Sequence, residues 1–348
     1  MALFGLGGPK RSVGLDIGSG LLKVAVVDHG KDQPQLDRVA LEELPGSAIV
    51  DGEVVDPGLV SGAIRDLFGR AGIDDGNLVI SVGGRDVIIK LIRMDRMDES
   101  DAREVIRWEA EQHVPFDMDN VELDFQITDP HGEGLQMKVL LVAAKRELVE
   151  NKLALVQEAG LEPDVVDVDA FALHNALEVN YPRSMHGLAG LVSIGHDTTT
   201  VNILDDGVPV LTRDLTFGTR RLTQDLQRER GLTAEEAEKV LRGETHDETL
   251  GDFLAERAQE VARGVERATA FLESQEVGEG IGRLYLCGGG VGIPGLAEAL
   301  ADRLAVETQV ASSVHAVQVK PGAMESGTID EVAPMLMLCT GLALRRPA

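Results

Sequence analysis

Aromatic residues are scarce in this 348-residue chain, at 3% of the sequence, so its hydrophobic core has to be built from aliphatic side chains. Cysteine is scarce too. Cys287 and Cys339 stand beside apolar neighbours, and we expect both to be buried free thiols. Two such residues exclude a disulfide framework and a cysteine-rich metal site, which indicates a reducing compartment.

Positive charge is also under-represented, with 33 Lys and Arg against 59 Asp and Glu and a formal net charge of −26. This balance argues against binding nucleic acid or anionic lipid through the general surface. Apolar runs fall short of the ~18 residues of a membrane-spanning helix, and the first residues lack the apolar segment of a signal peptide. We therefore expect a cytoplasmic protein without direct membrane insertion, which reaches a membrane only through a partner.

An internal repeat indicates two lobes built on one template. The stretch VGLDIGSGLLKVAVVDHG near the beginning aligns without a gap with a second stretch near the midpoint, which contains LVSIGHDTTTVNILDDG. Asp16 falls on Ser193, and Gly18 falls on Gly195. In both copies an apolar strand, a glycine-containing turn and a second strand follow one another, as in a β-hairpin.

The rest of the chain alternates between strand and helix patterns. Strands are predicted at 77–82, 86–92, 121–128, 135–144 and 283–287, and helices at 56–73, 97–117, 147–158, within 216–275, from 294 and at 334–344. Gly72 is expected to end the first helix, and Asp98 to cap the second. We predict a first lobe at 1–188 with an insertion at about 85–160, a second lobe at 189–338, and a segment at 339–348 that returns to the first lobe.

The turn of the first hairpin has the composition of a phosphate-binding loop. Gly18, Ser19 and Gly20 leave backbone N–H groups accessible to phosphate oxygens, and Lys23 supplies a nearby cation. Asp16 ends the preceding strand, where its carboxylate can hold a hydrated Mg²⁺ ion. A glycine-tipped hairpin with an exposed aspartate is the alternative, and the second copy of the hairpin weakens that alternative.

A third glycine cluster, LYLCGGGVGIPGL, follows a strand and precedes a helix. Gly290, Gly292 and Gly295 have the G-x-G-x-x-G spacing of a dinucleotide-binding loop, and Glu307 is then the candidate ribose ligand. We disfavour that interpretation because the motif lies late in the chain, Glu307 comes early, and the hairpin repeat stays unexplained. A glycine-lined wall for a purine base accounts for all three clusters.

Three glycine motifs in this order resemble the phosphate-1, phosphate-2 and adenosine motifs of the actin-like ATPase superfamily. Within it, the chain resembles the PilM family of type IV pilus assembly proteins, through IRWEAEQHVPFD, VLLVAAKRELV, EAGLEPDVVDVDAFALHNALE and LTRDLTFGTRRLTQDLQ. The resemblance covers residues 12–345. It implies an α/β, two-lobed actin-like (ribonuclease H-like, duplicated) ATPase fold with an inserted subdomain in the first lobe, as in FtsA.

The resemblance also implies ATP and Mg²⁺ as cofactors. It assigns Asp16 and Asp169 as catalytic residues, with Asp16 holding Mg²⁺ through water. The implied nucleotide-binding residues are Gly18, Ser19, Gly20, Lys23, Gly195, Thr198, Glu238, Gly289, Gly290 and Gly292. Two of these assignments have plain structural alternatives: Glu238 as a solvated helix carboxylate, and Asp169 as the N-cap of the helix that follows it.

Two positions depart from the pattern of hydrolytic relatives. Ser193 stands where those relatives have an aspartate, and Leu241 stands where some have a lysine near the nucleotide. Asp197 is a candidate substitute for the first, and Lys239 or Arg242 for the second. Because positioned charges supply most of the catalysis of phosphoryl transfer, we expect nucleotide binding with slow or absent hydrolysis.

The resemblance implies a scaffold protein of the inner-membrane pilus assembly platform. Its partners are then the cytoplasmic N-terminal tail of PilN, bound between the first lobe and the insertion, and other platform proteins. The alternatives are a metabolic kinase of the same superfamily, a filament-forming ATPase like FtsA or MreB, and the related cytoplasmic domain of type II secretion proteins. No confident general base or substrate loop for a kinase is evident.

Overall fold

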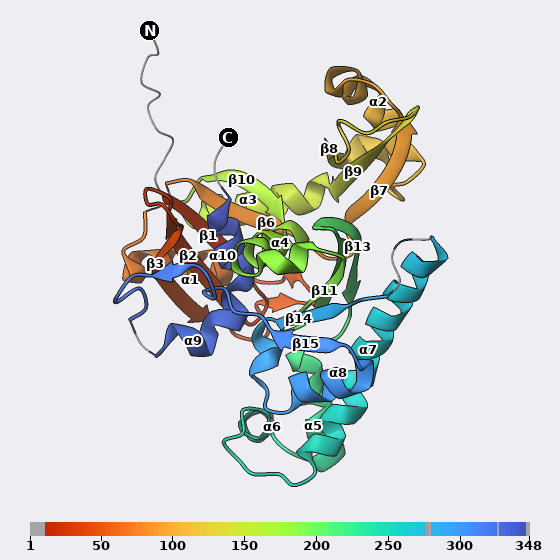
Figure 1. Ribbon diagram of the computed structural model, residues 1–348. Coiled ribbons are helices and arrows are strands. Elements are labelled where there is room, and N and C mark those ends of the chain that lie inside the picture. The colour runs from red at the N-terminus through yellow and green to blue at the C-terminus, as the bar shows by residue number, and fades with distance from the viewer. Residues whose placement is uncertain (1–10, 75, 276, 278–279, 326, 346–348) are drawn as a thin grey trace.

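The computed structural model describes residues 11–74, 76–275, 277, 280–325 and 327–345. Two large sheets form the body, and each is built on one hairpin of the sequence repeat (Figure 1). In each lobe the first hairpin strand also pairs in parallel with a later strand, so the repeat extends from sequence to topology.

The first sheet has six strands in the order β10-β6-β1-β2-β3-β16. They are β1 (Arg11–Ile17), β2 (Leu21–Asp28), β3 (Gln35–Glu43), β6 (Leu78–Val82), β10 (Pro163–Val168) and β16 (Gln318–Val319). A core of aliphatic side chains joins one face to α1 (Pro57–Ala71) and α3 (Arg146–Glu158). The other face packs against α4 (Asp169–Asn180) and α10 (Met337–Leu344).

The second sheet has five strands in the order β13-β12-β11-β14-β15. They are β11 (Leu188–Ile194), β12 (Thr199–Asp205), β13 (Val208–Leu215), β14 (Arg283–Cys287) and β15 (Glu307–Val310). Its helices are α5 (Thr219–Arg230), α6 (Ala234–Leu241), α7 (Leu250–Ser274) and α8 (Leu296–Leu304). Side chains from these helices and strands form one buried cluster, the core of the second lobe.

A smaller three-stranded sheet projects from the first lobe, in the order β7-β9-β8 (Figure 1). It comprises β7 (Val87–Asp95), β8 (Val121–Ile127) and β9 (Gln136–Lys145), and α2 (Glu99–Glu111) packs on it. The cluster between them is separate from the first-lobe cluster, in which Leu155 and Val156 of α3 are buried. The hydrophobic core of the insertion therefore ends before α3. The end of the insertion at about residue 160 remains a prediction.

The end of the chain returns to the first lobe at two places. β16 pairs with β3, before the return predicted at residue 339. Helix α10 then lies against β1 and α4 so closely that a Cβ on Gly14 or Gly341 would overlap backbone atoms of its neighbour. The remaining elements are the short hairpin β4 (Ile49–Val50) and β5 (Glu53–Val54), α9 (Ile329–Val332) and several single 3-10 turns.

The predicted helix ends are met in part. Gly72 follows α1 in the left-handed conformation, with φ +57°, as expected for a terminating glycine. Asp98 occupies the N-cap position of α2, but its side chain makes no capping hydrogen bond, so that part of the prediction is wrong. Both cysteines are buried, and burial raises the pKa of each thiol to about 12, which keeps them protonated.

Candidate functional site

The predicted phosphate-1 residues meet at the turn between β1 and β2. Asp16 and Lys23 face each other across the hairpin, with Lys23 Nζ 2.8 Å from Asp16 Oδ2. Burial disfavours the charged ammonium, but the Asp16 carboxylate outweighs this and raises the pKa of Lys23. A Cβ on Gly18 would lie 3.2 Å from Lys23 Nζ, so the ion pair lies directly against the backbone of the turn.

Asp169, in the first turn of α4, lies near this pair on the face of the first sheet that packs against α4 and α10, and its charge interacts with Asp16 and Lys23. Ser81 Oγ, at the end of β6, donates a 2.5 Å hydrogen bond to Asp169 Oδ1. Burial raises the pKa of Asp169 to about 6, and the negative charge of Asp16 adds to the increase. The N-cap of α4 is Val168, so Asp169 lies inside the helix and does not cap it.

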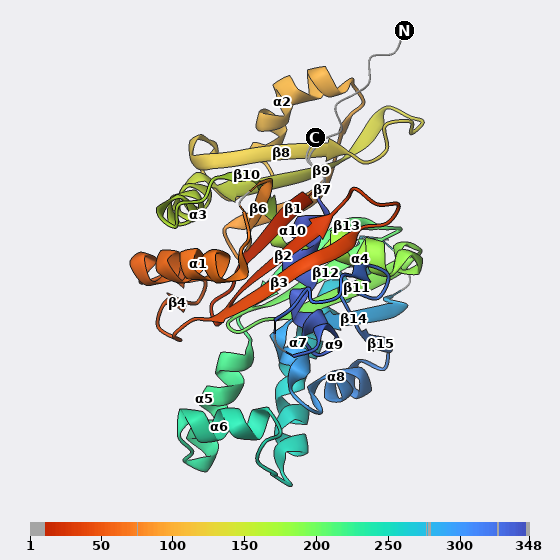
Figure 2. The same cartoon turned by 90° about the vertical axis from the view of Figure 1, so that its left-hand side faces the viewer.

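The second hairpin places its turn opposite the first (Figure 2). Gly195 N donates to Thr198 O at 2.9 Å and closes a tight turn in which the Thr198 side chain is exposed. A Cβ on Gly20 would lie 3.0 Å from the His196 ring, so the tips of the two hairpins touch. The two turns that the sequence predicts to contact phosphate, one from each lobe, are thereby brought together.

The third glycine cluster lies beside the second hairpin. It forms a single 3-10 turn, Gly289–Gly292, directly after β14. A Cβ on Gly290 would overlap the Ile194 side chain, whereas Gly289 and Gly292 have no neighbouring atom within 4 Å of such a Cβ. Packing against Ile194 therefore requires Gly290 and also Gly288, whereas Gly289 and Gly292 leave an open surface next to the hairpin.

Glu238 is exposed on α6, where its Oε2 lies 3.8 Å from an Arg242 nitrogen. Burial lowers the pKa of His196, and Glu238 is among the carboxylates that oppose this decrease, so its charge reaches the hairpin tip. Leu241 is buried in the second-lobe core, and Lys239 pairs with a glutamate one turn earlier on the same helix. The Leu241 position thus belongs to the core.

Asp197 does not replace the aspartate that is absent at position 193, as the sequence analysis considered, but takes part in a contact between the lobes. Its side chain is 2% exposed and lies 3.0 Å from Arg220 Nε. The same carboxylate accepts a 2.9 Å hydrogen bond from the backbone N–H of Asp51, in the β4–β5 turn. The group therefore joins the two lobes instead of standing in for an aspartate at position 193.

A further carboxylate, Asp214, was not predicted from sequence. Ser193 pairs with Thr200, and Thr200 pairs with Asp214, across β11, β12 and β13. Thr200 Oγ1 donates a 2.7 Å hydrogen bond to Asp214 Oδ1. Asp214 is solvent-exposed, but the protein packed around its carboxyl group partly desolvates it and raises its pKa. Its charge in turn raises the pKa of Asp169. Ser193 itself carries no carboxylate, but the Asp214 carboxylate lies two strands away in the same row of the sheet. The sequence alone does not show this proximity, because it depends on the strand register.

Lys152 is the second group that the sequence analysis missed. It lies on α3, and its charge interacts with Asp169 and Asp16. Burial lowers the pKa of the Lys152 ammonium, and both carboxylates oppose that decrease. The signal available in the sequence was a lysine spaced three and four residues from the apolar Leu155 and Val156 on one helix face.

Comparison with known proteins decides the family. The family profile described as type IV pilus assembly protein PilM matches residues 14–347. The chain belongs to the PilM family. The structure titled PilM-PilN type IV pilus biogenesis complex is 30% identical, with a TM-score of 0.83 over 97% of this chain and 98% of that chain. Both findings confirm the family predicted from the sequence motifs.

More distant relatives confirm the actin-like fold of this PilM family member. The cell division protein FtsA of Bacillus subtilis is 26% identical over 352 residues, covering 86% of this chain and 78% of FtsA. The ethanolamine utilization protein EutJ of Carboxydothermus hydrogenoformans is 19% identical, with a TM-score of 0.56 over 97% of this chain and 90% of EutJ. MreB5 of Spiroplasma citri bound to AMPPNP is 12% identical, with a TM-score of 0.54 over 96% and 95% of the two chains.

The donor set at the hairpins fits a magnesium nucleotide. Within the described ranges, no three His, Cys, Asp or Glu side chains are grouped to hold a metal ion by themselves. Magnesium usually retains several waters and takes one or two carboxylates together with substrate phosphates. Asp16, beside a glycine turn and a lysine, is positioned where it would supply such a carboxylate. Among the helices described, none is long and apolar enough to cross a membrane.

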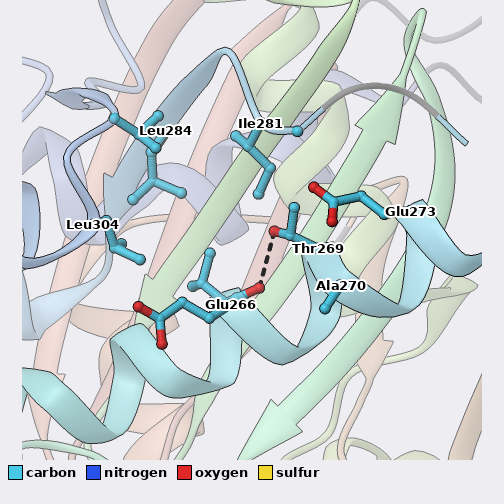
Figure 3. Close-up of a pocket in the computed structure, with 10 residues that line it drawn as sticks. Glu266, Thr269, Ala270, Glu273, Ile281, Leu284 and Leu304 are labelled. Atoms are coloured by element: carbon cyan, nitrogen blue, oxygen red, sulfur yellow. Dashed lines mark hydrogen bonds between the residues drawn. The ribbon is translucent and has the colours of Figure 1, made fainter.

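A separate cavity of about 320 Å³ lies in the second lobe, away from these residues (Figure 3). Half of its lining comes from α7, and the rest from β14, the segment that leads into it and the end of α8, with Glu266, Thr269 and Glu273 as its polar side chains. Thr269 Oγ1 donates a 3.0 Å hydrogen bond to Val265 O within the helix. None of the predicted nucleotide-binding residues lines this cavity, so it is not the candidate site.

Proposed function

We propose that this protein is an ATP-binding scaffold of the type IV pilus assembly platform. The observation that carries the proposal is the partly buried Asp16–Lys23 pair, which lies against a glycine turn and opposite the second hairpin. The pair supplies a carboxylate for Mg²⁺ and a cation for phosphate, and the open glycine surface next to Gly290 suits a flat base. MreB5, which shares the fold, was solved with AMPPNP bound.

We expect hydrolysis to be slow or absent. Ser193 offers no charge to a metal-bound water, and Asp197 is engaged by Arg220 and a backbone amide. Asp214 lies two strands from position 193 and its Oδ1 accepts the Thr200 hydroxyl, so it does not restore a carboxylate at position 193 itself. Catalysis of phosphoryl transfer depends on positioning such charges, so the site is better suited to holding ATP than to cleaving it.

The proposed partner is the cytoplasmic N-terminal tail of PilN. The support is that a relative of the same family was solved as a PilM-PilN complex at a TM-score of 0.83 to this chain. We place the tail at the junction of the first lobe and the insertion, which projects beside β6 and α3 (Figure 1). Through that partner a cytoplasmic protein would act at the inner membrane, together with other platform proteins.

Nucleotide binding is tested by thermal unfolding with and without Mg²⁺-ATP. We expect ATP at about 100 times its Kd to raise the Tm of the wild-type protein by about 3–5 °C. Asp16→Ala and the milder Asp16→Asn should lose this increase relative to their own baselines, because both remove the carboxylate. Asp66→Ala, at an exposed position on α1, should keep it. Full ATP stabilisation of both Asp16 variants would refute the site.

Partner binding is tested by capturing membrane proteins on the purified protein with and without ATP. Recovery of a small single-span protein through its first residues supports the scaffold, and a labelled peptide of that tail should then bind directly. Light scattering should stay flat on addition of ATP, since a filament-forming protein would raise it. Robust sugar phosphorylation without any captured partner would refute the scaffold in favour of a kinase.

A further inference from the structure

Among the residues that the structure describes, Lys152 is a cation near Asp169 and Asp16 to which the sequence assigned no role. It lies on the inner face of α3, three and four residues before the buried Leu155 and Val156. Side chains at these spacings share one face of a helix, so Lys152 projects toward the first lobe instead of toward solvent. Its side chain is half-buried there, and its charge interacts with Asp169 and Asp16.

Of the carboxylates Asp16, Asp169 and Asp214, the last two have no cation paired with them among the described residues. Asp16 is neutralised by Lys23 at 2.8 Å. Asp169 and Asp214 have hydroxyl donors, Ser81 and Thr200, but no ion pair within 4 Å in the described ranges. Lys152 likewise has no carboxylate within that distance among the described residues, although its charge interacts with two.

An ammonium in this position is suited to an anion that enters between the lobes. The terminal phosphate of a nucleoside triphosphate carries the charge that distinguishes it from the diphosphate. The unneutralised carboxylates Asp169 and Asp214 would repel that charge, and the half-buried Lys152, whose charge interacts with Asp169, offsets the repulsion. Charge-assisted hydrogen bonds from lysine to phosphate are among the stronger polar contacts in proteins.

We propose that Lys152 contacts the terminal phosphate of the bound nucleotide and makes the site prefer ATP to ADP. The proposal rests on the proposed nucleotide binding at the two hairpins. In this arrangement Lys23 pairs with Asp16 at the hairpin turn, whereas Lys152, on α3, binds the terminal phosphate. Through Lys152, helix α3 would contact ATP but not ADP, so its surroundings would differ between the two nucleotide states.

The test is isothermal titration of the full chain with Mg²⁺-ATP and with Mg²⁺-ADP. The wild-type protein should bind ATP more tightly than ADP. Lys152→Met, which keeps the length of the stem and removes the charge, should weaken ATP binding by about 10- to 100-fold. ADP binding should change by less than about threefold, because ADP lacks the contacted group. Lys138→Met, at an exposed position in β9, is the matched control and should behave as wild type.

Lys152→Arg keeps the charge and should retain most of the preference for ATP. Lys152→Gln serves as a second charge-removing variant if Lys152→Met does not fold. A preserved ATP preference in Lys152→Met or Lys152→Gln would overturn the inference while nucleotide binding stands. Equal losses of ATP and ADP affinity would also overturn it, since they indicate a structural role. Failure of the wild-type protein to bind either nucleotide would refute the proposed function itself, and the Lys152 inference with it.

Discussion

At the scale of single residues, burial decides the charge state of Asp169. Its carboxyl group is removed from water at the first turn of α4, and the pKa rises from 3.8 to about 6. The Ser81 hydroxyl and Lys152 favour the charged form, but they do not cancel the effect of burial. Near neutral pH Asp169 is therefore ionised, and this lowers the stability of the folded protein. The effect can be measured as a pH dependence of the free energy of unfolding.

This cost predicts a pH-dependent effect of Asp169→Asn. The folded state binds the proton more tightly than the unfolded state, so the wild-type protein loses stability as pH rises from about 4 to above 6. Near pH 5.2 the native carboxyl is mostly protonated and resembles the amide. At pH 7.5 it is charged, and the variant should gain about 1 kcal/mol relative to its effect at pH 5.2.

Urea unfolding of both proteins at the two pH values checks this. Asp66→Asn, exposed on α1, is the control and should show no such difference. A gain from Asp169→Asn that is equal at both pH values would contradict the raised pKa.

The sequence alone was sufficient to predict those site residues that belong to a short motif or to the internal repeat. Gly18 and Gly195 stand out because a repeat aligns them, and the structure places both turns together. Lys152 and Asp214 could not be found this way. Their relation to Asp169 depends on how α3 packs and on the register of β12 with β13, and neither is encoded in a short motif.

At the scale of elements, the Arg220 contact joins α5 of the second lobe to the β4–β5 hairpin of the first. Arg220 Nη2 donates to Gly46 O and to Ile49 O, each at 2.9 Å, and its Nε lies 3.0 Å from Asp197 Oδ1. The guanidinium therefore satisfies two backbone carbonyls and a buried carboxylate at once. Asp197 completes the connection by accepting the N–H of Asp51.

We predict that Arg220→Ala lowers the free energy of unfolding by about 3 kcal/mol. Removing one partner of a buried ion pair leaves the other charge uncompensated, here Asp197. Arg221→Ala is the matched control: it removes an exposed pair with Glu260 one residue later, and should cost less than about 1 kcal/mol. Denaturant midpoints at constant slope give both values. Equal effects of the two variants would show that Arg220 does not hold the lobes together.

Many of the long elements followed from periodicity, but β3, β10, β13 and β16 were not predicted, and two of these omissions have a clear physical cause. Strand β3 was not predicted, because Asp37 and Arg38 interrupt its apolar alternation, and a register irregularity against β2 lies nearby. The two-residue strand β16 carries too little pattern to be recognised, although it brings the chain back to the first sheet. The buried helix at the C-terminal end was predictable because it is apolar on all sides.

At the scale of the whole molecule, the insertion and the first lobe have separate cores. Ile106 on α2 belongs to the insertion cluster, and Ile64 on α1 to the first-lobe cluster. Separate cores allow separate local unfolding. We predict that Ile106→Ala, which costs about 2–4 kcal/mol by opening a cavity, speeds amide hydrogen exchange in 87–145 and leaves 11–43 nearly unchanged.

Hydrogen exchange followed by mass spectrometry measures both regions in one experiment. Ile64→Ala is the reciprocal variant and should speed exchange in 11–43 at least as much as in the insertion. Uniform acceleration across the molecule by Ile106→Ala would mean that the insertion unfolds only together with the body.

The fit of α10 against β1 has a consequence for biosynthesis. Gly14 is among the first described residues to leave the ribosome, and the helix carrying Gly341 is among the last. At about 5–20 residues per second, roughly 20–60 s separate the two. During that interval one face of the first sheet lacks its covering helix, whereas the second lobe can already close its own core. The lobe that begins first therefore matures last, and its uncovered apolar face is a natural substrate for chaperones.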